Sequence, residues 1–318
     1  MSVIIFLENT GGKLKKSAFE TLTYGYKTAQ ELQTNCIAVT IGDCSSQQET
    51  VAKYGAEKLI CIDNSLLDCD NQSTSEAISQ VYIKENGVAL VLSNSSYGKP
   101  IGPKIAVQCQ ASFISNVIEV PSSLKVRKKS FSGKAFEYAQ SQLENVVYAI
   151  SPNSFYVEEN PGSISSETFT ASNIGESSVK LINLEKSVGK VSLAEAEVVI
   201  SAGRGLKGPE NWHMVEELAD LLNAGTACSK PVSDIGWRPH SEHVGQTGVA
   251  IAPNLYIAIG ISGAIQHLAG VNSSKVMVAV NIDPEAPFFK AADYGIIGDA
   301  FEVVPRIIDS LKKFKENN

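Results

Sequence analysis

The sequence predicts an α/β protein with two parallel-sheet domains in tandem. Short apolar runs alternate with helix-period segments from the N-terminus onward, which is typical of parallel strands covered by helices. The chain has 318 residues, enough for two domains of ordinary size. A second strand and helix series begins near Val198, after a stretch rich in Ser, Glu, Gly and Asn at residues 158–178.

The first half alternates strands and helices. Residues 3–7 form an apolar run that predicts a buried strand, and Gly11 and Gly12 follow as a turn. Residues 17–32 predict a helix, because Ala18, Leu22, Tyr26 and Ala29 recur at spacings of three and four. The pattern then predicts strands at residues 36–41, 58–62 and 89–93, and helices at residues 49–54 and 75–84. A further helix is predicted to begin at Pro103, because proline is tolerated in the first turn of a helix.

The pattern of predicted elements changes in the middle of the chain. Residues 114–137 and 146–155 predict shorter, more polar strands, antiparallel and at the sheet edge. Residues 158–178 predict an exposed loop or linker, so we expect the domain seam there or slightly later.

The second half repeats the alternation. Residues 255–261 predict a strand buried on both faces, followed by a turn at Gly260, Ser262 and Gly263 and a helix at residues 264–268 that ends by Gly270. Before it come a strand at 198–201, a glycine-rich loop at 203–208, a helix with Met214, Val215, Leu218, Leu221 and Leu222 on one face, and a run of small residues at 224–231. After it come strands at 275–281 and 294–297, and a last helix from about Pro305.

Composition excludes several classes of protein. The net charge is −7, from 34 acidic and 27 basic residues, and the basic residues are scattered, so we expect no nucleic-acid partner. No apolar run reaches the roughly 18 residues of a spanning helix, so we expect no membrane insertion. The six cysteines form no C-x-x-C pair, which argues against a metal centre and fits a reducing compartment. Without a leader pattern at the N-terminus, we expect a cytoplasmic location.

Polar and glycine-bearing segments follow successive strands of the second half. They occupy residues 203–208, 228–230, 244–248 and 262–267, with Asn281 and Asp299 beyond them. Because loops after parallel strands meet at one edge of a sheet, these segments could line one crevice. They supply cations, amides, hydroxyls and one histidine, but no paired carboxylates and no thiol beside a base, so the chemistry would belong to a cofactor.

Each of these signals also has a structural explanation. The turn before residues 264–268 could hold phosphate at a helix N-terminus, or could be an ordinary strand-to-helix turn. A serine nucleophile at Ser262 is disfavoured, because Ala264 stands where the G-x-S-x-G motif has its second glycine. His267, on an apolar helix, is more often a packed histidine than a ligand-binding one.

Several motifs resemble the electron transfer flavoprotein alpha subunit family. The resemblance covers essentially the whole chain and is most specific in the second half. It is carried by SAGRGLKGPENW at 201–212, DIGW at 234–237, VGQTG at 244–248, LYIAIGISGAIQHLAG at 255–270 and NIDPEAPFFKAADYGIIGD at 281–299. In the first half it rests on GKPIGPKIAVQCQASFISNVIEV at 98–120 and SGKA at 132–135.

The resemblance implies an architecture and a set of partners. It implies two Rossmann-like domains: residues 1–188, which contact a partner and hold no cofactor, and residues 189–318, similar to the NAD/FAD-binding domain of deoxyhypusine synthase and binding FAD. Family members form a heterodimer with an electron transfer flavoprotein beta subunit. They carry electrons from acyl-CoA and other dehydrogenases to a membrane quinone oxidoreductase, as carriers rather than stand-alone enzymes.

The resemblance also assigns FAD-binding positions. Ser262 and the following N–H groups suit the pyrophosphate, Gln246 and Thr247 the flavin N5 and O4 edge, and His267 the N1 and O2 edge. Asn281 and Asp299 suit the ribose and adenine-side hydroxyls. The full set is Arg204, Ser229, Lys230, Val244, Gly245, Gln246, Thr247, Ser262, Gly263, Ala264, Ile265, Gln266, His267, Asn281, Asp299 and Ala300.

One position departs from the family pattern. Ser229-Lys230 stands where the family usually has Ser-Arg, and lysine keeps the charge but loses the planar fork of arginine. We therefore expect weaker stabilisation of the one-electron-reduced flavin than in Arg-bearing relatives. Two other functions stay open: an NAD-dependent enzyme on a deoxyhypusine synthase-like or sirtuin-like domain, and an assembly factor whose N-terminal unit binds a nucleotide.

Overall fold

The structure is a computed structural model, and the described residues fall into two compact units. It describes residues 1–43, 45–63, 70–131, 135–174, 179, 182, 193 and 196–317. Residues 1–131 and 135–174 belong to unit 1, and residues 196–317 belong to unit 2. The predicted boundary between residues 188 and 189 lies outside the described residues, as do residues 132–134 of the SGKA segment.

Unit 1 is built on a mixed sheet in which its described residues form nine strands. The order is β11-β5-β4-β1-β6-β10-β7-β8-β9, and pairing is parallel except at β7-β8 and β8-β9. The strands are β1 (Ser2–Phe6), β4 (Asn35–Ile41), β5 (Lys58–Ile62), β6 (Gly87–Ser93), β7 (Ser112–Val117), β8 (Lys125–Ser130), β9 (Ala135–Gln140), β10 (Val146–Ile150) and β11 (Ser165–Phe169). A small antiparallel pair, β2 (Asn9–Thr10) and β3 (Lys13–Leu14), turns at Gly11 and Gly12 as predicted.

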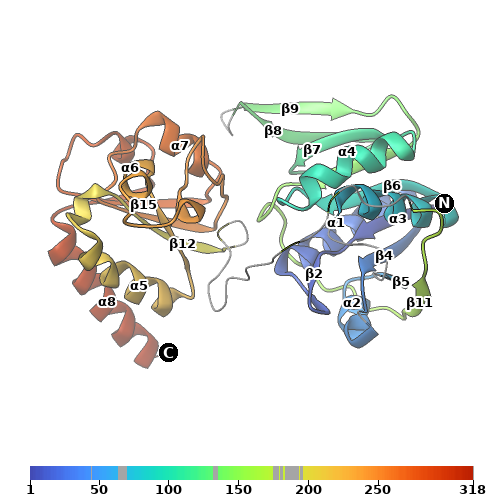
Figure 1. The fold of residues 1–318 in the computed structure, drawn as a ribbon, viewed down its shortest axis with the longest axis horizontal. Coiled ribbons are helices and arrows are strands. Elements are labelled where there is room, and N and C mark those ends of the chain that lie inside the picture. The colour runs from blue at the N-terminus through green and yellow to red at the C-terminus, as the bar shows by residue number, and fades with distance from the viewer. Residues whose placement is uncertain are drawn as a thin grey trace. The chain divides into compact units, whose positions relative to one another are not determined.

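Helices cover both faces of this sheet (Figure 1). α1 (Lys16–Leu32) and α2 (Gln48–Ala52) pack with Val3 and Ile5 on one face. α3 (Asn71–Lys84) and α4 (Gly98–Gln108) pack with Ile4 and Phe6 on the other. Successive residues of β1 therefore point into two different cores, which explains why its residues after Ser2 are all apolar.

Three features of unit 1 differ from the prediction. β10, predicted as an antiparallel edge strand, is fully buried and pairs in parallel with β6 and β7; only β8 and β9 form the predicted antiparallel edge. The predicted linker contains β11, which adds a parallel strand beside β5. α4 begins at Gly98, so Pro103 lies inside the helix rather than in its first turn, and leaves the Lys99 carbonyl without its intrahelical donor.

Unit 2 contains a parallel sheet that has five strands within the described residues. Its order is β13-β12-β14-β15-β16. α5 and α8 lie side by side against one face (Figure 1), while α7 packs on the other. The strands are β12 (Val198–Ala202), β13 (Gly225–Cys228), β14 (Leu255–Ile259), β15 (Val276–Asn281) and β16 (Tyr294–Ile297). The helices are α5 (His213–Leu222), α6 (Lys230–Asp234), α7 (Ile265–Val271) and α8 (Ala300–Glu316).

The predicted fold class is confirmed, with two local corrections in unit 2. The run of small residues before Pro231 contains β13, which the sequence analysis missed. α8 begins at Ala300, earlier than predicted, because the Asp299 carboxylate accepts a hydrogen bond from the Phe301 N–H and caps the helix. Nowhere in the described chain is there a helix both long and apolar enough to span a bilayer.

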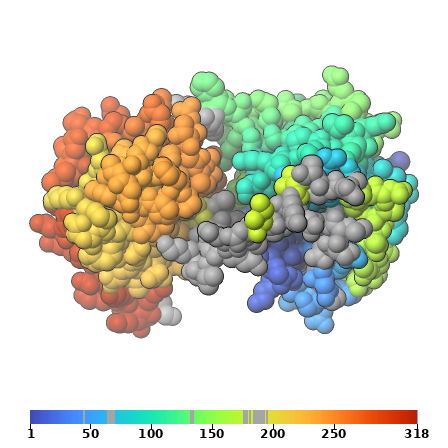
Figure 2. Space-filling model, in the orientation of Figure 1, coloured from blue at the N-terminus to red at the C-terminus, as the bar shows by residue number. Residues whose placement is uncertain are grey.

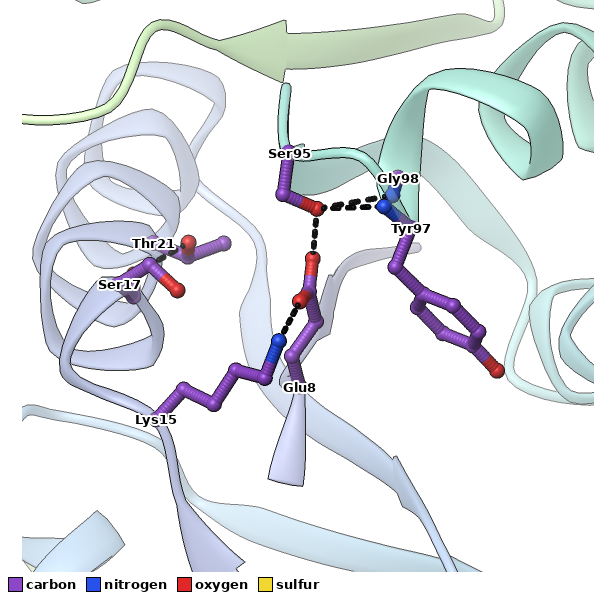
Figure 3. Close-up of polar contacts among 7 residues, drawn as sticks. All are labelled: Glu8, Lys15, Ser17, Thr21, Ser95, Tyr97 and Gly98. Carbon is purple, nitrogen blue, oxygen red and sulfur yellow. Dashed lines mark hydrogen bonds and ion pairs between the residues drawn. The ribbon is translucent and has the colours of Figure 1, made fainter. Parts of the chain in front are cut away.

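A buried polar network lies where the strand order of unit 1 reverses. The chain builds β1, β4 and β5 in one direction and then places β6 on the other side of β1. Glu8 follows β1 and Ser95 follows β6, and the Ser95 hydroxyl donates to the Glu8 carboxylate (Figure 3). The same hydroxyl oxygen accepts from the N–H groups of Gly98, at 2.9 Å, and Tyr97, at 3.1 Å. The Lys15 ammonium pairs with Glu8 at 3.0 Å.

This network predicts a stability effect for Glu8→Gln. The substitution keeps an oxygen for Ser95 but removes the charge that pairs with Lys15, and Glu8 is only 4% exposed. Because Lys15 can regain some water, we expect the free energy of unfolding of unit 1 to fall by about 1–3 kcal/mol. The measurement is urea unfolding followed by circular dichroism and by tryptophan fluorescence. Both tryptophans, Trp212 and Trp237, are in unit 2, so a transition seen by circular dichroism without a change in tryptophan fluorescence is the unfolding of unit 1.

A matched control is Lys27→Gln, which breaks the exposed pair with Glu158. It should change the free energy of unfolding by less than about 1 kcal/mol. Equal losses for the two variants would contradict a stabilising role of the Glu8 network.

Candidate functional site

The strand order of unit 2 creates a crevice at the carboxyl ends of β12 and β14. The chain goes from β12 to β13 on one side, and then crosses to place β14 on the other side of β12. The segments that follow β12 and β14 therefore lead to helices on opposite faces, α5 and α7. In sheets of this order, the point where the loops diverge is the usual ligand site.

A cavity of about 490 Å³ lies at this point, within the range of about 300–1,000 Å³ typical of small-molecule sites. The segments around it are coloured yellow to orange in Figure 2. Most predicted binding residues line it: Arg204, Ser229, Lys230, Val244, Gly245, Gln246, Thr247, Ser262, Ala264, Gln266 and His267. Sequence positions spread over more than sixty residues thus meet around one space.

Three glycines bring the loops after β12 and β14 into backbone contact. The Gly205 N–H donates to the Gly260 carbonyl at 3.2 Å. A Cβ atom on Gly203 would lie 2.3 Å from the Gly260 oxygen, and one on Gly205 would lie 2.6 Å from the Gly260 Cα. Gly260 itself has φ of +60°, a conformation that favours glycine. The base of the cavity therefore requires glycine at these positions.

Residues 243–247 are tied to both sides of the cavity. The Val244 N–H donates to the Cys228 carbonyl at 3.1 Å, which sets this segment beside the end of β13. The Gln246 N–H donates to the Gln266 carbonyl at 2.7 Å, which joins the segment to α7. These two hydrogen bonds explain why Ser229, Gln246 and Gln266 share one cavity although they lie on different elements.

Five predicted binding residues do not line the cavity. Gly263 has φ of +85°, and a Cβ there would lie 2.4 Å from the Phe288 nitrogen, so it is needed for packing. Ile265 is 65% exposed. Asn281 donates to the Ile261 carbonyl at 3.0 Å and so supports the loop from behind. Asp299 caps α8, and Ala300 is buried in the core beneath it. Their contact with a ligand stays a prediction.

Five further lining residues were not predicted as binding residues: Gly203, Pro231, His243, Gly260 and Ile261. His243 is the polar one, and it immediately precedes the predicted Val244. Its parallel bridge to Cys228 brings it to the cavity. Residue spacing alone does not predict this bridge between Cys228 and His243, so the only sequence signal for His243 was its position next to the VGQTG segment.

The cations around the cavity differ in how they are held. Arg204 has an exposed side chain in the loop after β12. The Lys230 ammonium lies 2.9 and 3.1 Å from the two carboxylate oxygens of Asp234, so part of its charge is neutralised. Burial, with the nearby Lys230 charge, lowers the pKa of His243. Positive charge in the site therefore comes from Arg204 and Lys230.

His267 is packed against the cavity as a neutral imidazole. It is 7% exposed, and burial lowers its pKa to about 4, so it is uncharged at neutral pH. Its Nε2 atom shares a hydrogen bond of 2.8 Å with the Tyr256 hydroxyl, whereas its buried Nδ1 has no hydrogen-bond partner among the described residues. Nearby, burial raises the pKa of the Cys228 thiol to about 12, so this thiol is not a nucleophile at neutral pH.

Comparison with known families identifies the two units. Residues 3–173 match the family described as the electron transfer flavoprotein domain. Residues 192–272 match the one described as the electron transfer flavoprotein FAD-binding domain. The second match includes every segment that lines the cavity. FAD, rather than NAD, is therefore the cofactor of unit 2.

Full-length relatives agree with this result. Electron transfer flavoprotein subunit alpha of Bacillus subtilis is 34% identical over 324 residues, covering 98% of this chain and 97% of the relative. The protein of the same name from Thermoanaerobacterium thermosaccharolyticum is 33% identical over 326 residues, covering 98% of each. The mitochondrial one of Dictyostelium discoideum is 33% identical over 334 residues, covering 98% of this chain and 92% of the relative. The chain thus belongs to the electron transfer flavoprotein alpha subunit family, a family of electron carriers.

Proposed function

We propose that this chain holds FAD in the unit 2 cavity and carries electrons as one half of a heterodimer with a beta subunit. In this proposal it accepts electrons from acyl-CoA and other dehydrogenases and delivers them to a membrane quinone oxidoreductase. The observation that supports it most is the cavity at the β12 and β14 divergence, lined by the predicted residues within the FAD-binding domain.

The residues around the cavity fit a flavin dinucleotide. Arg204 and Lys230 supply positive charge for an anionic diphosphate. Ser262 and Thr247 supply hydroxyls, and Gln246 supplies an amide, for hydrogen bonds that orient a polar ring. The buried Nδ1 of His267 has no hydrogen bond among the described residues, and an acceptor on the ligand would satisfy it.

The chain's own residues orient and shield the cofactor in this proposal. FAD supplies the redox chemistry when bound. Ser262 and the N–H groups that follow would hold the diphosphate, Gln246 and Thr247 would hydrogen-bond to the flavin ring, and His267 would donate a hydrogen bond to it.

The remaining assignments follow from the family. The names of the relatives describe an alpha subunit, which supports a beta-subunit partner for this chain. We assign partner contact without a cofactor to residues 1–188 and FAD binding to residues 189–318. A cytoplasmic location stays a prediction.

The first test of this function compares two cations of one loop. Arg204 lines the cavity, whereas Lys207 pairs with Asp299 at 3.5 Å and does not line it. We expect Arg204→Ala to weaken FAD binding by roughly 10–100-fold, because a charge-assisted hydrogen bond is lost, and Lys207→Ala to change it less than about threefold. The full chain, co-expressed with the beta subunit, is titrated with FAD and followed by its visible absorption.

Two outcomes would count against this assignment. Purified complex without flavin absorption, and without FAD uptake, would overturn the proposed function. Equal losses of FAD affinity in Arg204→Ala and Lys207→Ala would show that Arg204 does not bind FAD.

The pairing of Lys230 with Asp234 predicts an electrochemical difference. Asp234 offsets part of the Lys230 charge, and lysine lacks the planar fork of arginine. We expect Lys230→Arg, and separately Asp234→Asn, to increase the separation of the two one-electron potentials of bound FAD by roughly 10–40 mV. Spectroelectrochemical titration of the complex measures both potentials, and Lys207→Arg serves as the control. Unchanged separation in both variants would show that this charge does not act on the flavin.

A further inference from the structure

Tyr256 and His267 form a buried pair, in which His267 lines the cavity and Tyr256 lies behind it in the core. Tyr256 lies on β14 with no exposed surface, and its ring is nearly parallel to that of Phe288, with ring centroids 6.1 Å apart. The His267 ring, on α7, lies 6.0 Å from the same Phe288 ring. The Tyr256 oxygen and His267 Nε2 are 2.8 Å apart. This packing holds the imidazole in place before a ligand arrives.

The direction of this hydrogen bond follows from counting protons. Burial raises the pKa of Tyr256, so its hydroxyl keeps its proton at neutral pH. A buried hydroxyl proton needs an acceptor. Ser201, on the neighbouring strand, is close enough to act on Tyr256, but its Oγ makes no hydrogen bond within the described residues. His267 Nε2 is then the acceptor for the Tyr256 proton.

The opposite arrangement leaves more groups unsatisfied. If Nε2 carried the proton and donated to Tyr256, the tyrosine proton would have no acceptor and the Nδ1 lone pair no donor. With Tyr256 as the donor, one group lacks a hydrogen bond of regular geometry, the Nδ1–H of His267, although the Val244 backbone is close enough to raise the pKa of the ring. Since the imidazole is neutral, it carries one proton, and the bond at one ring nitrogen decides which nitrogen holds it.

We propose that Tyr256 is a positioning residue whose hydroxyl fixes His267 as the Nδ1–H tautomer, which makes Nδ1–H a neutral donor for a carbonyl or ring-nitrogen acceptor of the bound ligand. This inference rests on the proposed FAD site. It implies that His267 contributes a directed hydrogen bond to the flavin ring rather than positive charge. Burial first, and then the neighbouring His243, lower the pKa of the ring by more than the Val244 backbone raises it, so the charged ring is disfavoured.

The tautomer can be read directly by nitrogen NMR. The chain contains four histidines, so ¹⁵N-histidine labelling gives few signals, and a His267→Gln variant assigns those of His267. In the full-length protein at pH 7, before FAD is added, we expect a protonated Nδ1 and an unprotonated Nε2. A wild-type His267 with its proton on Nε2 overturns the proposal, whether or not any variant folds.

Variants then test whether Tyr256 sets the tautomer. Tyr256→Phe keeps the aromatic ring and removes only the hydroxyl, so we expect the proton to shift from Nδ1 toward Nε2 and FAD binding to weaken by roughly 2–10-fold. Ser201→Ala should leave the tautomer unchanged. Tyr148→Phe is a matched control, because Tyr148 is also fully buried and its hydroxyl has no hydrogen-bond partner within the described residues. This variant should leave both the His267 tautomer and FAD binding unchanged.

The outcomes separate this inference from the proposed function. If the His267 tautomer is unchanged in Tyr256→Phe and the complex still binds FAD, the role of Tyr256 is overturned and the proposed function stands. The same tautomer shift in Ser201→Ala would also overturn it, because the tyrosine proton would then depend on Ser201. A complex that takes up no FAD overturns the function itself, and its absorption spectrum reveals this independently of the NMR result.

Discussion

The backbone contact between the loops after β12 and β14 is the constraint on which the site depends. β12 and β14 pair directly, and the segments after them diverge to opposite faces of the sheet. Because Gly205 and Gly260 meet without side chains, the loops stay joined at their base while the space above them opens. Residues 244–246 are held beside this contact by hydrogen bonds to the Cys228 carbonyl on one side and to the Gln266 carbonyl of α7 on the other.

Much of the fold could be predicted because apolar periodicity is a local signal. The apolar run at residues 255–261 predicted β14, which ends at Ile259, since both faces of this strand are buried. β10 was misplaced because the predicted segment 146–155 joined the apolar run at residues 146–150 to the polar residues 151–154, which hid the pattern of a strand buried on both faces. β13 escaped notice because its residues, Gly225–Cys228, are small and it is held by pairing with β12.

The site was predictable where single loops contribute, and less so where packing decides. Arg204 and Gln246 line the cavity as expected from their places after strands. Asn281 also follows a strand, yet its side chain donates a hydrogen bond to the Ile261 carbonyl. This contact depends on how the loops after β14 and β15 pack against each other. His243 reached the cavity through a bridge to a distant strand. Sequence spacing contains neither kind of information.

Unit 1 has the same kind of strand reversal as unit 2, but in unit 1 side chains of the protein fill the position where the strand order reverses. Where the order reverses beside β1, the Glu8 carboxylate is already bound by the Ser95 hydroxyl, which itself accepts the first N–H groups leading into α4. An incoming phosphate would meet a negative charge there and would have to displace an internal ligand. In unit 1 this position is thus filled by a carboxylate of the chain itself, whereas in unit 2 the corresponding position opens into the cavity.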